Sequence, residues 1–509
     1  MERGRAQTQG SEGLAKASGR NLLAFSCTLL AQFVTIPLVV RWIGMDAFGV
    51  ASLVISLTAP LTATGTALAQ SATREMAVRM GRGDDVGMVK AEESTRALCL
   101  IVCAAGAVLI AGLGGPLVQA IGGHDYARST SWSLYAWAAI GWVGQQATLL
   151  NQGYCAAAQD FGRMARVGAI AALLTTLITL GLTLLRPDAT GYMAGFSLSW
   201  VSTWLCWIIY TRRSGDRRRR VRLHRAALPS LLHFSKWQSA AQLAGVAGNQ
   251  VDRYMLAAMM PASVVGQYST TKRLQEAVSI GVIKLTEVLF PYFGATSEDS
   301  RESRRSFFIT ASWLVGTLSV AALGPIFPLS DAILLLWAGP EAAAGGASLL
   351  QILILGGMLG CGSNVFTYCA MGLGLSATVA RLVWIYSVLT VLASVALLWW
   401  WGATAAGVGL LIASAVRLAI AMAWTRKYLF EELAWGTLMT SMLLPLVAGI
   451  TVSVILAETK IGVGLRWWEI LLLYPLAALI IALVSTGLAL ATPPGRRLLS
   501  TIKAQKRYL

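Results

Sequence analysis

Apolar runs of about 20 residues recur along the chain, separated by short polar segments. A helix of that length crosses the hydrocarbon core of a bilayer, which is roughly 30 Å thick. The pattern therefore predicts an all-α, polytopic membrane protein with about fourteen spans, whereas a β-barrel would show short alternating segments. The expected spans are 21–43, 48–72, 97–121, 132–156, 167–186, 190–211, 231–259, 265–291, 307–328, 346–372, 378–401, 406–425, 437–456 and 467–490.

The composition agrees with a membrane protein. Hydrophobic residues make up 56% of the chain and charged residues 13%, against about 25% charged in soluble domains. The net charge is +17, and its densest block is RRSGDRRRRVRLHR at 212–225. Lys and Arg gather in the loops of one side, which predicts that both termini are cytoplasmic. We therefore attribute the basic surplus to topology and to attraction by anionic lipids of the bilayer, and expect no nucleic-acid partner.

The basic block also divides six spans from the following eight. We expect an N-terminal lobe over 1–228, a C-terminal lobe over 229–428, and two further helices with a basic tail over 429–509. The two lobes echo each other weakly. RWIGMDAFGVASLVIS at 41–56 and AMMPASVVGQYSTTKR at 258–273 carry Gly49 and Gly266 at the same place. Repeats of this kind are typical of transporters with a site between the halves, although chance similarity of apolar hairpins is the alternative.

Several classes of site are excluded by what the chain lacks. All seven cysteines fall inside expected spans and show no metal-binding spacing, so we interpret them as small apolar packing residues. The phosphate-binding pattern GxxxxGK[ST] is absent. We expect neither a metal site nor a cofactor.

The eighth expected span, TTKRLQEAVSIGVIKLTEVLFPYF at 270–293, contains five charges: Lys272, Arg273, Glu276, Lys284 and Glu287. At 100° per residue, all but Lys272 fall on one stripe about 80° wide. A charge at mid-bilayer costs about 2.5–3.5 kcal/mol, so the stripe should face protein or water. The alternative is that these charges are structural. Glu276 would then pair with Lys272, and Glu287 with Lys284, and the pairs would fix the helix to a neighbour. Lys284 and Glu287 could also extend to the membrane interface.

Three further charged residues lie inside expected spans. Asp252 and Arg253 occur in GNQVDRYM at 248–255, and Arg417 lies in LLIASAVRLAIAMAW. The alternative for Asp252 and Arg253 is that they anchor the end of their helix. The alternative for Arg417 is that its side chain extends to the membrane interface. A cationic lining suits an anionic group such as a diphosphate. A carboxylate in a cavity of low dielectric can titrate near working pH or bind a cation, as coupling to a gradient requires.

The motifs resemble those of a known family. IPLVVRWIGMDAFGVASL, ATREMAVRMGRGDD, NQVDRYMLAAMMPASVVGQYSTTKRL, LFPYFGATSED and LLLWAGPEAAAGGASLLQIL are similar to stretches of bacterial polysaccharide-biosynthesis membrane proteins. These are the Wzx-type flippases of the multidrug/oligosaccharidyl-lipid/polysaccharide exporter superfamily. The resemblance extends over most of the chain and includes the number of spans.

The resemblance implies a flippase rather than an enzyme. Its substrate would be an undecaprenyl-diphosphate-linked oligosaccharide, moved across the bacterial inner membrane for O-antigen, capsule or exopolysaccharide synthesis. Two six-helix lobes around a central cavity would alternate access, driven by a proton or a sodium ion. A polysaccharide polymerase and a chain-length regulator are implied partners. Carried onto this sequence, the head-group residues are Arg253, Lys272, Arg273, Lys284 and Arg417, and the ion-coupling residues are Asp252, Glu276 and Glu287.

Other functions stay open from the sequence. A lipid II flippase would share the fourteen spans. A drug/cation antiporter would need an anionic cavity, against which the lysine and arginine of the eighth span argue. A membrane polymerase would need catalytic residues on a sizeable outer loop, and the loops here are short. A scaffold for glycan assembly would tolerate neutralisation of the span-eight charges.

Overall fold

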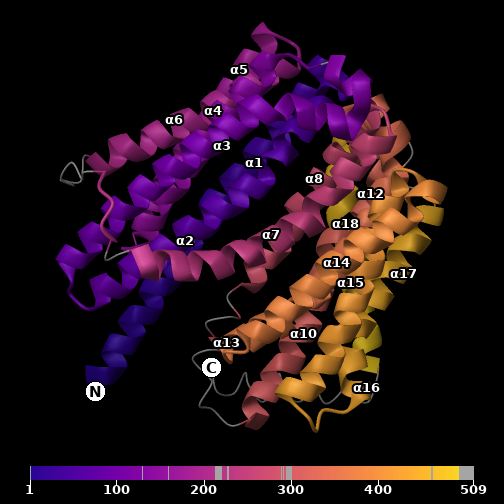
Figure 1. Cartoon of the computed structure of the whole chain (residues 1–509). Coiled ribbons are helices and arrows are strands. Elements are labelled where there is room, and N and C mark those ends of the chain that lie inside the picture. The colour runs from indigo at the N-terminus through magenta and orange to yellow at the C-terminus, as the bar shows by residue number, and fades with distance from the viewer. Residues whose placement is uncertain are drawn as a thin grey trace. The chain divides into compact units, whose positions relative to one another are not determined.

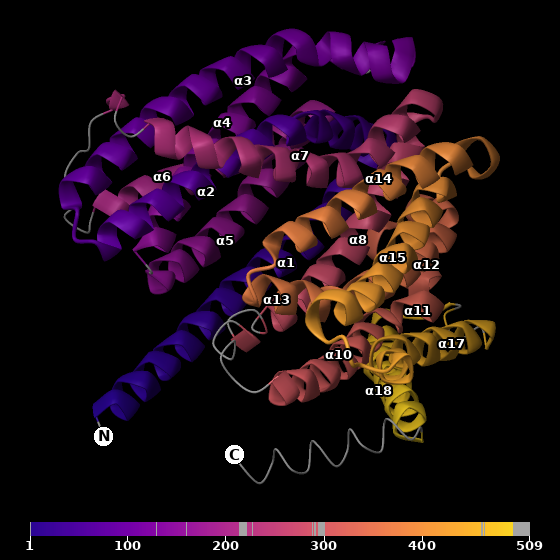
Figure 2. The same cartoon turned by 60° about the horizontal axis from the view of Figure 1, so that its bottom comes forward.

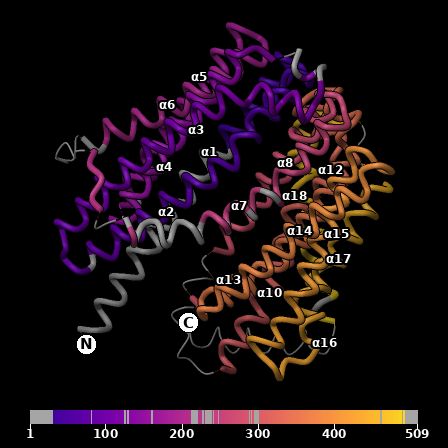
Figure 3. Tube along the Cα trace, viewed as in Figure 1, coloured from indigo at the N-terminus to yellow at the C-terminus, as the bar shows by residue number. Residues whose placement is uncertain are grey.

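A computed structural model describes the backbone of residues 2–128, 130–158, 160–212, 221–225, 228–287, 289, 292–293, 301–459, 462 and 464–491. The other residues are among those drawn in grey in Figure 3. They include most of the arginine-rich block, 213–220, and the basic tail, 492–509, so the predictions for these segments lie outside the described residues. Within the described residues every regular element is a helix, as the sequence predicts.

The chain divides into two compact units. The first unit comprises Met1–Val246 and Arg253–Gly266, and the second comprises Ala247–Asp252 and Gln267–Leu509. Helix α7 (Leu228–Met259) and helix α8 (Ala262–Thr286) each contribute residues to both units.

The first unit contains six complete helices. They are α1 (Glu2–Leu57), α2 (Ala59–Gly81), α3 (Asp85–Arg128), α4 (Trp132–Ala157), α5 (Phe161–Leu185) and α6 (Ala189–Arg212). Helix α4 packs against α2, α3 and α6, and α5 packs against α1 and α6. Figure 1 shows α3, α4 and α6 running side by side.

The second unit holds the remaining helices. They are α10 (Arg301–Leu323), α11 (Ile326–Ala338), α12 (Pro340–Gly362), α13 (Asn364–Gly372), α14 (Ser376–Trp401), α15 (Thr404–Trp424), α16 (Trp435–Leu438), α17 (Leu444–Glu458) and α18 (Trp467–Ala491), with π-helical turns η2 (Thr425–Leu429) and η3 (Met439–Leu443). Helix α12 packs against α10, α11 and α15, and α14 lies along α15. Helices α17 and α18 pack on each other and on α10 (Figure 2).

A helix or a run of helices lies at each of the fourteen expected spans. Ten helical segments of the described chain are long and apolar enough to cross a membrane. Helices α2, α4, α7 and α8 are not among the ten. The last two hold the charged residues that the sequence marks, except Arg417 on α15 and Glu287 just after α8, and their helical structure follows the prediction nevertheless.

The boundary between the first two spans differs from the prediction. Helical structure continues to Leu57 and is interrupted at Gly44, where φ is +79°, so a new helical segment begins at Met45. Thr58 keeps α-helical backbone angles, and α2 runs on to Gly81, nine residues beyond the expected end at 72. The hydrophobic pattern misses this end because the last turns of α2 carry Glu75 and Arg79.

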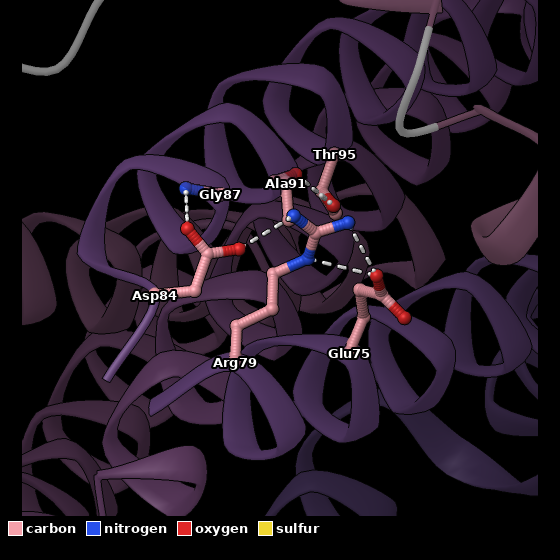
Figure 4. Close-up of polar contacts among 6 residues, drawn as sticks. All are labelled: Glu75, Arg79, Asp84, Gly87, Ala91 and Thr95. Carbon is pink, nitrogen blue, oxygen red and sulfur yellow. Dashed lines mark hydrogen bonds and ion pairs between the residues drawn. The ribbon is translucent and has the colours of Figure 1, made fainter. Parts of the chain in front are cut away.

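These charged residues close the turn between α2 and α3 (Figure 4). Arg79 pairs with Glu75 at 2.8 Å and with Asp84 at 3.3 Å. Asp84 also accepts a hydrogen bond from the backbone N–H of Gly87 at 2.8 Å, which caps the start of α3. Glu75 and Asp84 each have a structural partner, so the cluster stabilises the turn.

Candidate functional site

The second unit buries a charged cluster between α7 and α8. The Lys272 Nζ donates to Asp252 Oδ2 and, at 2.8 Å, to the backbone carbonyl of Asn249. The Tyr268 hydroxyl donates to the same carboxylate oxygen. Asp252 is 6% exposed, and Tyr268 and Lys272 are each 1% exposed. The cluster therefore contains an ion pair that is almost fully removed from solvent.

The sequence of α8 explains why Lys272 points to α7. Tyr268 and Lys272 are four residues apart and share one face of the helix. An adjacent face carries Gln267, Thr271 and Gln275, which lie opposite Gly345, Gly346 and Gly357 of α12 respectively. The glycines let the two helices approach closely, since a Cβ at Gly346 would lie 2.7 Å from Thr271 Oγ1. This packing fixes the rotation of α8 and directs Lys272 toward Asp252.

The contacts within the cluster offset the free-energy cost of burying its two charges. Removing an ion from water costs several kcal/mol, and an attractive partner offsets this only when its geometry is good. Here the carboxylate receives an ammonium and a phenol hydroxyl, and the ammonium also lies 5.4 Å from the Tyr268 ring centroid. Loss of either charge would leave the other buried without its partner.

A second cation, Arg417, lies in the same unit. The Arg417 guanidinium carbon is 5.3 Å from the ring centroid of Tyr386 on α14. Its Nε is buried and has no hydrogen-bond partner among the described residues. Tyr386 interacts electrostatically with both Arg417 and Asp252. Gly248 of α7 packs against Ser387, beside Tyr386, and thereby brings α14 next to the cluster. Asp252, Lys272 and Arg417 thus belong to one region.

The charged stripe expected on α8 is divided in the structure. Lys272 is buried, Arg273 and Glu276 are half-buried, and Lys284 and Glu287 are exposed. Of the two pairs that the structural alternative allows, Lys284–Glu287 is present at 2.8 Å. The Lys272–Glu276 pair is absent, because the Lys272 ammonium donates to Asp252 of α7, and no hydrogen bond or ion pair joins Glu276 to the described chain.

Arg253 is also buried, and it belongs to the first unit, whereas Asp252 belongs to the second. The structure therefore brings Asp252 and Lys272 into contact, with Arg417 linked to them through Tyr386, while Lys284 and Glu287 form a separate exposed pair. The roles of these residues in binding a head group or an ion remain predictions.

The sequence reasoning missed Tyr268, Tyr386 and the carbonyl of Asn249. A signal exists only for Tyr268, because it precedes Lys272 by four residues and must share its face. The contact of Arg417 with Tyr386 joins residues 31 positions apart on two helices, and no spacing in the sequence predicts it.

Two polar residues of α4 contact α2. Thr62 Oγ1 of α2 donates to Gln145 Oε1 at 3.4 Å, and Gln146 packs against Gly65 of α2. Gln146 also lines a small cavity of about 10 Å³ with residues of α2 and α3. Within the described residues, no group of three or more His, Cys, Asp or Glu is placed to hold a metal ion.

Comparison with known proteins identifies the family. The model of the polysaccharide biosynthesis protein family matches residues 14–297, more than half of the chain, including all of α7 and α8. No curated protein matches the chain.

Solved structures show the same fold at low sequence identity. The lipid II flippase MurJ in an inward closed conformation has a TM-score of 0.73 at 10% identity, covering 94% of this chain and 99% of its own. An inward-facing multidrug resistance MATE family transporter of the MOP superfamily has a TM-score of 0.69 at 16% identity, covering 81% of this chain and 99% of its own. A MOP superfamily transporter from Pyrococcus furiosus, described as having a binding pocket of reverse polarity, scores 0.62 at 15% identity, covering 81% and 95% respectively.

The helical architecture and these matches agree with one another. The chain therefore belongs to the polysaccharide biosynthesis protein family and has the fold of the MOP superfamily transporters.

Proposed function

We propose that this protein is a flippase for undecaprenyl-diphosphate-linked oligosaccharide units used in surface polysaccharide synthesis. It would move them across the bacterial inner membrane by ion-coupled alternating access, with both termini in the cytoplasm. The observation that carries the proposal is the buried Asp252–Lys272 pair in helices that the polysaccharide biosynthesis family model covers. The pair places a cation and a carboxylate in two helices that the sequence predicts to span the membrane. Ionisable residues there are costly, and they are typically retained for function.

The substrate chemistry follows from the cations. A lipid-linked sugar of this class carries a diphosphate, and Lys and Arg are the side chains that bind phosphate oxygens. Lys272 and Arg417 are the central candidates because each is positioned by helix packing, through α7 and Tyr386 respectively. Arg253, Arg273 and Lys284 are the further candidates for the head group. Asp252 is the first candidate for ion coupling, followed by Glu276 and Glu287.

Transport itself tests the proposal. Purified protein is reconstituted into vesicles with a fluorescent undecaprenyl-diphosphate oligosaccharide, and a membrane-impermeant quencher reports which leaflet holds the lipid. We expect protein-dependent movement that accelerates when a proton or sodium gradient is imposed. Absence of movement under both gradients would reject the proposal.

The second candidate function is that of a lipid II flippase, and transport rates of two lipids distinguish it from our proposal. The fold match to MurJ over 94% of the chain favours keeping it. Fluorescent lipid II carries the same diphosphate and polyprenyl tail, so it is the matched control for the sugar. Movement of the oligosaccharide lipid well above that of lipid II supports our proposal, and the reverse order supports the second candidate.

A further inference from the structure

The Lys272 ammonium occupies a position that would suit a small cation. It contacts a carboxylate oxygen of Asp252 and the backbone carbonyl oxygen of Asn249. Carboxylate and carbonyl oxygens are the ligands that transporters use for sodium, and hard cations in general prefer oxygen. In this chain, however, the cation is covalently attached to α8.

No space is left beside the carboxylate on the side of Lys272. Lys272 and Tyr268 are each 1% exposed, and both donate to the same oxygen of Asp252. A sodium ion at this oxygen would have to displace the ammonium, and no second carboxylate among the described residues pairs with Lys272. Displacement would therefore leave a buried cation without a counter-ion.

We propose that Lys272 is a built-in counter-ion that fills the cation position at Asp252, so that this carboxylate binds no sodium ion. The inference deepens the proposed function, on which it rests for the coupling role of Asp252. It assigns the exclusion of sodium from this carboxylate to Lys272. A chain with an uncharged residue at 272 would have an open cation site at the same place.

The described groups that face Asp252 donate to it or carry positive charge. They include Lys272 and Tyr268 from α8, and Tyr386 from α14 with Arg417 stacked on it. None of these four residues is a carboxylate, so none of them could replace Asp252 as the partner of the Lys272 ammonium.

Thermal unfolding of the purified protein tests this assignment without any transport. Wild type, Lys272→Met and the double variant Asp252→Asn/Lys272→Met are unfolded at pH 8 in sodium chloride or in choline chloride of equal ionic strength. We expect the wild-type midpoint to be the same in both salts. Lys272→Met should unfold earlier in choline and recover by several degrees in sodium, whereas the double variant should respond equally to both salts.

Two results would overturn the inference. One is sodium stabilisation of wild type that disappears in Asp252→Asn, which would place sodium at this carboxylate despite Lys272. The other is a folded Lys272→Met that ignores sodium, which would show that the position is not a cation site. If sodium stabilises both wild type and Asp252→Asn, the sodium ion binds at another site, and the inference that Asp252 binds no sodium stands.

If Lys272→Met does not fold, equilibrium binding of radioactive sodium to wild type and Asp252→Asn decides the question, with equal binding expected. None of these measurements uses the lipid substrate. A failure of the flippase assay would therefore reject the proposed function while leaving the ion assignment to be judged on its own results.

Discussion

Gly49 and Gly266 pack directly against each other in the first unit. A Cβ on Gly49 would lie 2.9 Å from the backbone nitrogen of Gly266, and one on Gly266 would lie 3.3 Å from that of Gly49. Each would also meet a carbonyl oxygen four residues before the opposite glycine, Ala262 O and Met45 O respectively. The two contacts are therefore reciprocal, as two copies of one hairpin related by a two-fold axis would produce.

Other contacts hold the same segment in place. The Tyr126 hydroxyl donates to the carbonyl of Met260 at 3.1 Å, and the Tyr254 hydroxyl donates to that of Ser56 at 2.6 Å. Burial, assisted by nearby Asp46, raises the pKa of the Tyr126 phenol, so it stays protonated and can donate at neutral pH. Arg253–Gly266 is thus fixed to the first unit at three points, and the glycine pair is the one where backbones approach most closely.

Gly266→Ala should lower the free energy of unfolding by about 1–3 kcal/mol, because the new methyl group overpacks a backbone contact that cannot move aside. The matched control is Gly281→Ala in the same helix, where a Cβ would meet nothing within 4 Å. That change should be neutral or stabilising by about 0.5–1 kcal/mol, as alanine favours the helix. Thermal or denaturant unfolding in detergent measures both. Equal effects of the two substitutions would contradict the close contact.

A double-mutant cycle measures the buried pair. Asp252→Asn and Lys272→Met should each destabilise the protein by about 3–5 kcal/mol, since each leaves one buried charge without its partner. The double variant should lose less than either single variant, giving a coupling energy on the order of 2 kcal/mol or more. Additive losses would mean that the two side chains do not interact in the folded protein.

The exposed pair on the same helix should behave differently. Lys284 and Glu287 are 40% and 53% exposed, and ion pairs of this kind contribute about 0–1 kcal/mol. Lys284→Ala and Glu287→Ala should therefore leave the unfolding midpoint nearly unchanged. Any loss of lipid movement in Lys284→Ala would then reflect contact with the head group, whereas a large loss of stability would show that the pair is structural.

The positions of most spans follow from the sequence because a membrane helix needs a long apolar run. Ten helical segments of the described chain meet this requirement, and α2, α4, α7 and α8 do not. What the sequence could not decide was the partner of each charge. Lys272 has a carboxylate four residues away on its own helix, Glu276, and another twenty residues back on α7, Asp252. Helix geometry allows the first pair, but the rotation of α8 set by the glycines of α12 turns Lys272 toward the second.

The same argument applies to Arg417, whose stacking on Tyr386 depends on the packing of α14 along α15. If this guanidinium binds the diphosphate during transport, Arg417→Gln should slow lipid movement by about ten- to a hundredfold, the equivalent of a lost hydrogen bond to a charged group, about 1.5–3 kcal/mol. Arg381→Gln is the matched control, because Arg381 is an exposed arginine of the same unit and should have little effect. The quencher assay in vesicles gives both rates, at protein amounts equalised by gel filtration. Equal rates for the two variants would remove Arg417 from the head-group path, and the buried guanidinium would then act only through its contact with Tyr386.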